Sequence, residues 1–291
     1  MASWFIMRDW LAKVVDWYSI CSGSGQICKS EAQGMKVRIL GAHSIEAKGQ
    51  LMASLLIDGV LALDAGGLTS SLPLSEQQKV RAILLTHHHF DHTRDLVTLG
   101  ANGAAFPTPV DVYALSHTID IVNSCLLDGK IYADFSKWPS KEKPFLCLNV
   151  IESFQRQNIQ GYDVLPVTVQ HSVPSVGFQV TSKDGKSLFY TGDTGPGLAD
   201  CWQKISPHLL IIEVSGINKS EEFLRSVGHL SAGLLKEELM QFRQIKGYLP
   251  RVIVIHIPPH SQREVEQEVK EVSRGLGVRI DIGYEGMKVT L

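Results

Sequence analysis

Short apolar runs separated by polar loops recur along most of the chain, which is the pattern of a sheet-rich domain. The runs are LMASLLID, VLALDAG, AILLTH, VDVYAL, YDVLPVTVQH, VGFQVTS, SLFYTGD, HLLIIEVS and RVIVIHI. Longer segments with apolar residues three and four apart predict amphipathic helices, and these are LSEQQKV, SHTIDIVNSCLL, SAGLLKEELMQFRQI and SQREVEQEVKEVSRGLG. Strands interleaved with such helices predict an α/β layered domain.

The first 34 residues depart from this pattern. Charged residues interrupt the apolar stretch MASWFIMRDWLAKVVDWYSI, which predicts an amphipathic helix and argues against a signal peptide or a membrane span. The Gly- and Ser-rich CSGSGQICKSEAQG then predicts a linker, and MKVRILGAHS has the alternation of a first strand. We therefore expect an N-terminal helix and linker over residues 1–34, which can serve a homodimer, and a catalytic domain over residues 35–291.

The amino-acid composition limits which binding partners and which cellular compartment we expect. The 28 basic and 30 acidic residues give a net charge of -2, so no whole-molecule field favours nucleic acid or a membrane surface. Five scattered cysteines, none spaced as CxxC, indicate free thiols rather than a disulfide framework. Together these features predict a cytoplasmic protein with a small-molecule substrate.

The segment THHHFDH, residues 86–92, carries the strongest chemical signal. It follows an apolar strand predicted at residues 83–86 and leads into a helix predicted to begin near Asp91. Residues two apart in extended chain face the same way, so His87 and His89 share one direction, and Asp91 and His92 can face a second point. Imidazole and carboxylate are ligands of zinc, manganese and iron. A histidine-rich surface loop is the alternative, but the H-x-H-x-D-H spacing behind a strand favours two metals.

THHHFDH resembles the T-H-x-H-x-D-H signature of the metallo-β-lactamase superfamily. The likeness continues in chain order through LALDAGG, VTVQHSVPSVGF, YTGDTG and VIVIHIPP, which contain Asp64, His171, Asp193 and His256. This resemblance implies an α/β fold, the four-layer αββα sandwich. It also implies a site for two divalent metal ions, with zinc as the first expectation and manganese or iron as alternatives.

The resemblance assigns a role to each matching position. His87, His89 and His171 would bind one metal, Asp91, His92 and His256 the other, and Asp193 would bridge them, while Asp64 would support the metal loop through hydrogen bonds. Taken singly, His171 and His256 can also be buried structural histidines and Asp193 a turn residue. His43, His117, His208 and His260 lack a motif and are predicted not to bind metal, although His43 in GAHS can lie near the site.

Two further segments resemble phosphodiesterases of this superfamily. VGHLSAGLLKEEL places His229 at the entry of a helix, as in the G-H-L-[ST] element, where an imidazole can bind a phosphate oxygen or protonate a leaving oxygen. A capping histidine is the alternative. IVNSCLLDGKIYADFSKWP resembles a segment of class II cyclic-nucleotide phosphodiesterases, so Tyr132 and Phe135 are candidates for stacking on a base, with a buried aromatic patch as the alternative.

The sequence departs from that class at three places. Pro258 stands where a basic residue is frequent, GAHS stands in place of a more Gly-rich first loop, and Arg94-Asp95 stands where a small residue is frequent. These departures concern the substrate rather than the metals.

These resemblances imply a binuclear metal-dependent phosphodiesterase that hydrolyses 3',5'-cyclic nucleotides or a similar small phosphodiester. A metal-bridging hydroxide would attack phosphorus, with Asp91 and His229 as catalytic residues. An RNA 3'-end endonuclease is an alternative that would need a protruding basic arm, and a thioesterase or lactamase is another. A nucleotide-sensing binding protein on the same fold is the non-enzyme alternative, although such proteins typically lose metal ligands.

Overall fold

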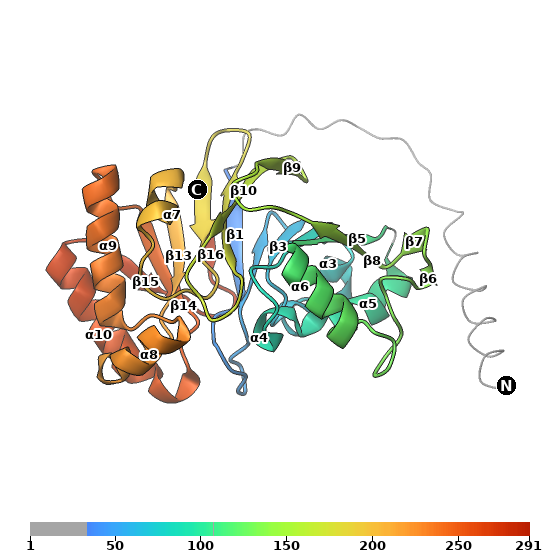
Figure 1. Ribbon diagram of the computed structural model, residues 1–291, viewed down its shortest axis with the longest axis horizontal. Helices are drawn as coiled ribbons and strands as arrows, with labels where there is room; N and C mark the ends of the chain where they lie inside the picture. Colours follow the sequence, from blue (N-terminus) through green and yellow to red (C-terminus); the bar gives the residue numbers. More distant parts are fainter. Residues whose placement is uncertain (1–33, 107) are drawn as a thin grey trace. The chain divides into compact units, whose positions relative to one another are not determined.

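Two seven-stranded β-sheets lie face to face in the computed structural model, which describes residues 34–106 and 108–291 (Figure 1). The first sheet has the strand order β16-β1-β2-β3-β4-β5-β8, and the second has the order β15-β14-β13-β12-β11-β10-β9. A separate small hairpin consists of β6, Pro139–Ser140, and β7, Lys143–Pro144.

Both sheets contain parallel and antiparallel pairs. The strands of the first sheet are β1 Lys36–Gly41, β2 Ser54–Ile57, β3 Leu61–Leu63, β4 Ala82–Leu84, β5 Val110–Ala114, β8 Leu146–Val150 and β16 Lys288–Thr290. Those of the second sheet are β9 Gln157–Ile159, β10 Tyr162–Thr168, β11 Val176–Thr181, β12 Ser187–Tyr190, β13 Leu209–Glu213, β14 Arg251–Ile255 and β15 Ile280–Ile282. Strands β3, β4, β5 and β8 run parallel, as do β12 to β15. The carboxyl ends of each parallel group therefore share one edge of their sheet.

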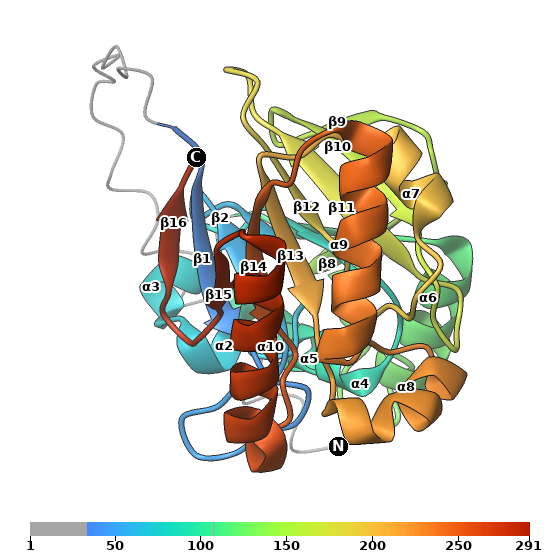
Figure 2. The same ribbon diagram turned by 90° about the vertical axis from the view of Figure 1, so that its left-hand side faces the viewer.

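Helices cover the outer faces of both sheets (Figures 1 and 2). Those beside the first sheet are α2 Leu68–Ser71, α3 Leu74–Gln77, α4 Phe90–Thr93, α5 Asp95–Asn102 and α6 Ser116–Ile121. Those beside the second are α7 Ala199–Lys204, α8 Glu221–Val227, α9 Ala232–Lys246 and α10 Gln262–Leu276. This layering confirms the predicted αββα sandwich.

Three hydrophobic clusters match the three interfaces between these four layers. The central cluster includes Leu55 and Leu61 of the first sheet and Phe178 and Ile211 of the second. A second cluster joins the second sheet to α7, α9 and α10, and a third joins the first sheet to its own helices. Burial of apolar area on both faces therefore fixes each sheet in position.

The longest helices form where sequence signals agree with this packing. Helix α9 begins after Ser231, whose hydroxyl accepts a hydrogen bond from the Leu234 amide, and ends at Gly247 with a φ of 78°. Leu235, Leu239 and Phe242 recur at helical spacing and are buried. The cap, the left-handed glycine and the apolar stripe thus specify the same element.

Residues 34–291 form one compact unit, and the helix predicted before it lies outside the described residues. Within the described part, Cys125, Cys147 and Cys201 are free thiols, as expected. In the same part of the chain, no helix has the length and apolar character needed to span a membrane.

Replacing Phe178 by Ala is expected to lower the free energy of unfolding by about 3–5 kcal/mol, because the ring is 0% exposed between the sheets and leaves a cavity. Chemical denaturation of the variant and the wild type at equal metal content measures this. The control is Phe223→Ala at a 65% exposed position, which should change the unfolding free energy by less than about 0.5 kcal/mol. A loss below about 1 kcal/mol for Phe178→Ala would contradict its place in the central cluster.

Candidate metal centre

The candidate site residues lie in loops that follow strands of both sheets at one end of the sandwich. THHHFDH follows β4 and includes α4, while the loops after β10, β12 and β14 carry His171, Asp193 and His256. Helices α4 and α8 mark this end in both views (Figures 1 and 2). The two sheets thereby bring together side chains that are far apart in the sequence.

Three imidazoles lie around Asp193, and we name these three rings the first half-site. Nε2 of His87 lies 3.7 Å and Nε2 of His171 lies 4.0 Å from Asp193 Oδ2. His89 Nδ1 lies 3.2 Å from His171 Nε2. Possible ligand atoms of these four residues all lie within 4.8 Å of one another.

A second group surrounds the other oxygen of Asp193, and we name it the second half-site. Nε2 of His92 lies 3.1 Å and Nε2 of His256 lies 3.2 Å from Asp193 Oδ1. Asp91 Oδ2 lies 3.1 Å from His256 Nε2 and 3.4 Å from His92 Nε2. The structure therefore brings all seven predicted ligands together, in the predicted division and with Asp193 common to both groups.

The buried atoms of this centre fit divalent metal ions. Nε2 of His87, Nε2 of His92 and Oδ1 of Asp193 are buried and form no hydrogen bond with any described residue. Buried polar atoms without a partner are rare in folded proteins because each costs about 1–3 kcal/mol. Imidazole nitrogens and carboxylate oxygens without thiolates suit zinc, manganese or iron.

Four imidazoles are oriented by hydrogen bonds from their outer nitrogen. His87 Nδ1 donates to Thr86 Oγ1 at 3.0 Å, and His92 Nδ1 donates to Asp64 Oδ2 at 2.7 Å. His171 Nδ1 donates to the Gly228 carbonyl at 2.9 Å, and His256 Nδ1 donates to Ser215 Oγ at 2.7 Å. These bonds leave the Nε2 lone pair of each ring turned inward. His89 differs, because its Nδ1 faces the centre.

The two half-sites differ in their electrostatics. Burial lowers the pKa of His87 well below its usual range and also lowers the pKa values of His89 and His171, which keeps the first half-site neutral and able to bind a metal. Burial acts to lower the pKa of His92, but the Asp193 and Asp91 carboxylates raise it well above its usual range. The second half-site therefore attracts positive charge.

Asp64 connects the metal loop to the second sheet, as the sequence predicted for a supporting residue. Its buried carboxylate accepts hydrogen bonds from the Thr86 amide at 2.8 Å, from His92 Nδ1 at 2.7 Å and from the Tyr190 hydroxyl at 2.7 Å. Asp64 also has a φ of 56°, an uncommon value for a residue with a side chain. The hydrogen bonds hold a backbone conformation that would otherwise be unfavourable.

His256 occupies a similarly unusual conformation, with a φ of 66°. Its amide donates to the Ala42 carbonyl at 2.6 Å, and its Nδ1 donates to Ser215. Contacts from two other loops thus hold the ring toward Asp193, and such strain concentrates at functional sites.

Glu213 is a functional candidate that the sequence analysis missed. This buried carboxylate, the last residue of β13, lies 2.7 Å from His229 Nδ1, accepts from the Thr194 amide at 2.8 Å and accepts from Ser215 Oγ at 2.5 Å. Burial acts to lower the pKa of His229, but the Glu213 charge and hydrogen bond raise it to about 9. An acidic residue that ends the apolar run HLLIIEVS was the available signal.

His229 lies beside both half-sites. Its ring centroid is 4.9 Å from that of His171 and 5.8 Å from that of His256, with which it is stacked. The preceding Gly228, with a φ of 77°, allows this approach, because a Cβ there would lie 2.8 Å from the Cα of His171. The GH pair of VGHLS thus has a steric reason for its glycine.

Glu238 of α9 is a second missed residue, and it holds the loop after Asp193. Its buried carboxylate accepts hydrogen bonds from the Gly197 amide at 2.6 Å, the Leu198 amide at 3.3 Å and Trp202 Nε1 at 2.9 Å. Such fully bonded charges are tolerated in a core.

The structure corrects one predicted contact residue. Phe135 is 2% exposed and packs in the core beside Gly100 and Phe145, so it has no free face to stack on a base. The alternative of a buried aromatic patch is therefore correct for Phe135. Tyr132 is 56% exposed, and its role in stacking stays a prediction.

The Arg94-Asp95 pair has a structural function. Asp95 Oδ2 accepts a hydrogen bond from the Thr69 amide at 2.7 Å in the first turn of α2, and Arg94 Nε donates to Asp95 Oδ1 at 2.9 Å. His43, His117, His208 and His260 belong to none of the possible metal-binding groups among the described residues.

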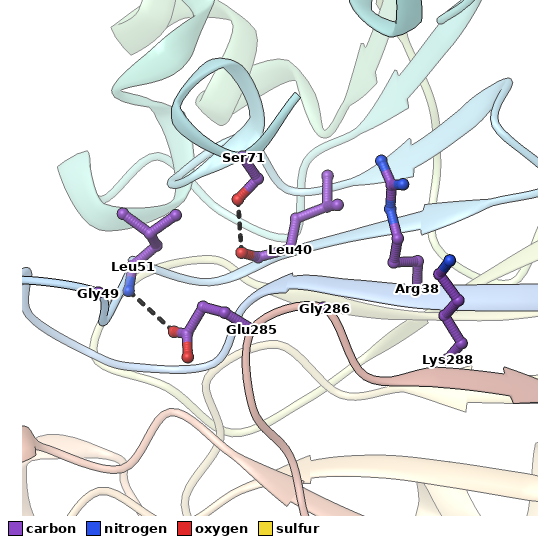
Figure 3. Close-up of a pocket in the computed structure, with 8 residues that line it drawn as sticks. All are labelled: Arg38, Leu40, Gly49, Leu51, Ser71, Glu285, Gly286 and Lys288. Atoms are coloured by element: carbon purple, nitrogen blue, oxygen red, sulfur yellow. Dashed lines mark hydrogen bonds between the residues drawn. The ribbon is translucent and has the colours of Figure 1, made fainter. Parts of the chain in front are cut away.

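His43 contacts Glu285, which lines a cavity of about 500 Å³ (Figure 3). Its Nδ1 lies 2.7 Å from Glu285 Oε1, which also accepts from the Leu51 amide at 2.8 Å and the Ala42 amide at 3.2 Å. Figure 3 shows Glu285 directed toward Leu51, away from Arg38 and Lys288. This carboxylate fixes the loop whose Ala42 carbonyl contacts His256.

Comparison with known sequences places this geometry in context. The sequence profile of the Beta-lactamase superfamily domain matches residues 54–257. The 3',5'-cyclic-nucleotide phosphodiesterase 1 of Saccharomyces cerevisiae is 25% identical over 250 residues, which cover 72% of this chain and 67% of that protein. A metal-dependent hydrolase of Staphylococcus aureus is 28% identical over 124 residues, which cover 41% of this chain and only 48% of that protein.

Solved structures share the same fold. Unliganded yeast PDE1 superposes with a TM-score of 0.77 at 17% identity, covering 89% of this chain and 100% of that chain. The short form of human tRNase Z superposes with a TM-score of 0.64 at 16% identity, covering 88% of this chain and 98% of that chain.

Asp64→Asn is expected to weaken metal binding by about 10- to 100-fold, because the amide cannot accept all the hydrogen bonds that orient His92 and Thr86. Competition with a chromophoric chelator measures the affinity. Asp111→Asn on β5 is the matched control and should retain wild-type affinity. Unchanged affinity in Asp64→Asn would contradict the supporting role of Asp64.

Proposed function

The chain belongs to the beta-lactamase superfamily, and we propose that it is a metal-dependent phosphodiesterase acting on 3',5'-cyclic nucleotides or a similar small phosphodiester. The observation that carries this proposal is the pair of half-sites on opposite oxygens of Asp193, with the Glu213–His229 pair beside both. The yeast relative named 3',5'-cyclic-nucleotide phosphodiesterase 1, aligned over 72% of the chain, supports the substrate class.

The proposed ligands of the two metals follow the geometry of the half-sites. They are His87, His89 and His171 for the first metal, Asp91, His92 and His256 for the second, and Asp193 for both. Bound divalent ions, zinc being our first expectation, would supply an activated water and offset charge on the phosphate.

Residues of the chain itself orient the reacting groups. The Asp91 carboxylate is 23% exposed, so one oxygen can accept a hydrogen bond from water at the mouth of the second half-site. His229 is 21% exposed, and with Nδ1 bound to Glu213 its Nε2 is available to a phosphate oxygen or to the departing oxygen. Because Glu213 favours the protonated imidazole, His229 can donate a proton to the leaving group.

A small diester fits the surroundings better than a long RNA. A cavity beside His171 and Gly228 has a volume of about 360 Å³, and the net charge of the chain is -2. RNA binding relies on many cationic contacts with phosphates. The cytoplasmic location and the homodimer stay predictions from the sequence.

Zinc- or manganese-loaded protein is expected to hydrolyse 3',5'-cyclic AMP to a single AMP isomer, and His89→Ala should abolish this activity because it removes a ligand of the first half-site. Chromatography that resolves 5'-AMP from 3'-AMP identifies the ester that is cut. A 3'-extended RNA and a thioester are tested in parallel. If metal-replete protein releases no AMP but cleaves the RNA or the thioester, the proposed activity on cyclic nucleotides is wrong and the cleaved substrate identifies the alternative.

His229→Ala is expected to lower kcat by about 10²- to 10⁴-fold while metal content stays at the wild-type level, because His229 serves the substrate and not the metals. Turnover and metal content are measured on the same preparation. His260→Ala, at an exposed position on the short helix Pro259–Ser261, is the control and should behave as wild type. Wild-type turnover in His229→Ala would exclude the proton-donor role.

A further inference from the structure

The cavity of about 500 Å³ lies on the outer face of the first sheet (Figure 3). Its wall includes Arg38 and Leu40 of β1, Lys288 of β16 and Ser71 of α2. Residues two apart on a strand face the same way, and Leu40 packs between this sheet and its helices, so Arg38 shares the outer face. None of the described residues that line the cavity belongs to either half-site, so it is separate from the metal centre.

Two cations stand opposite each other in this wall. Arg38 and Lys288 are direct partners in the antiparallel pairing of β1 with β16. Figure 3 shows both side chains extending from their strands in the same direction. Like charges at directly opposed positions of a sheet destabilise the pairing. An anion close to both side chains would remove this repulsion.

The chain itself supplies only part of that negative charge. Glu76 Oε2 lies 2.6 Å from Arg38 Nη2, and this ion pair leaves the Arg38 side chain 24% exposed. Nε of Arg38 is buried and forms no hydrogen bond with any described residue. Lys288 is exposed and has no ion pair within the described part of the chain. The guanidinium is therefore only partly paired, and the ammonium group is open to a ligand.

The rest of the wall leaves this cationic end unopposed. Glu285 also lines the cavity, but it is directed toward Leu51, away from Arg38 and Lys288 (Figure 3). Its Oε1 accepts hydrogen bonds from the Leu51 amide at 2.8 Å and the Ala42 amide at 3.2 Å, which offset its charge.

The cavity also has room for an organic group beside the cations. The side chains of Leu40 and Leu51 give it apolar surface, and Ser71 Oγ donates to the Leu40 carbonyl at 2.6 Å, which fixes α2 against β1. The volume lies within the range of about 300–1,000 Å³ that is usual for small-molecule pockets.

We propose that this cavity is a binding site for a small phosphate-bearing anion, with Arg38 and Lys288 holding the phosphate group. A phosphate monoester carries a charge of about -1.5 to -2 at neutral pH and presents three acceptor oxygens. It can therefore accept hydrogen bonds from a guanidinium and an ammonium group at the same time. The site goes beyond the proposed function and does not depend on it.

The test measures how fast an N-hydroxysuccinimide ester of acetate acetylates Lys288 in the full-length, metal-loaded protein, by mass spectrometry. Inorganic phosphate should slow this reaction severalfold, because the bound anion covers the ammonium group. Acetate ion at the same ionic strength should not slow it, because a monovalent carboxylate has only two oxygens to share. Lys130, which is 81% exposed and lies outside the cavity, is the control within the same sample and should react at an unchanged rate.

Two variants should shift the phosphate concentration for half-maximal protection in opposite directions. Arg38→Ala should raise it by about tenfold or more, because charge-assisted hydrogen bonds are lost. Glu76→Gln should lower it, because the carboxylate that competes for Arg38 is removed. A folding defect would not tighten binding. Arg156→Ala, at a 50% exposed position paired with Asp163, is the matched control and should keep the wild-type value.

Three results would overturn the proposal. They are equal protection of Lys130 and Lys288, equal protection of Lys288 by acetate, and a wild-type half-maximal concentration in both Arg38→Ala and Glu76→Gln. A titration with 5'-AMP distinguishes the sources of the ligand. Protection at a lower concentration than with inorganic phosphate identifies a phosphomonoester that uses the apolar wall, and protection by inorganic phosphate alone identifies the free ion.

The acetylation of Lys288 separates this proposal from the proposed function. It reports on the cavity and not on hydrolysis at the metal centre. Absence of phosphodiesterase activity would therefore leave a protected Lys288 as evidence for the anion site. An unprotected Lys288 in an active phosphodiesterase would refute the anion site alone.

Discussion

The structure depends on one buried carboxylate, which lies at the end of the sandwich where loops from both sheets meet. Asp193 is 2% exposed, and four imidazoles approach its two oxygens within 4.0 Å. An isolated carboxylate in such a place would be strongly unfavourable, so the surrounding groups must supply positive charge. These groups come from loops that follow β4 in the first sheet and β10 and β14 in the second. The ends of these strands must therefore lie close to the end of β12, which Asp193 follows. The same arrangement gives a cation a ready set of donors.

Three further buried carboxylates hold these loops in fixed positions. Asp64, Glu213 and Glu238 each accept several hydrogen bonds, and each joins segments that are distant in the sequence. Fully bonded networks of this kind fix ring orientation in a way that apolar packing alone does not. The positive φ values of Asp64 and His256 are sustained by these contacts and by the apolar clusters that hold the strands.

The two half-sites differ in what surrounds them. The second half-site is backed by the Ala42 loop, which Glu285 fixes through two amides and His43. His171 of the first half-site forms part of the wall of the cavity of about 360 Å³. The Glu213–His229 pair lies beside both half-sites, with the His229 ring centroid 4.9 Å from that of His171 and 5.8 Å from that of His256.

Much of the fold and the candidate ligands could be predicted from the sequence. The spacing of apolar residues distinguished strands from amphipathic helices, and THHHFDH with the later strand-end residues, through their resemblance to the superfamily, predicted which side chains form the two half-sites, because these signals lie in residues that are close together in the chain. Features that depend on contacts between distant residues became visible only in the folded structure. Phe135 lies in an aromatic segment that reads equally well as surface or core, and only the packing beside Gly100 buried it. Glu213 carries no local motif, and its partnership with His229 exists because β13 ends where the loop before α9 returns to the same edge of the sheet.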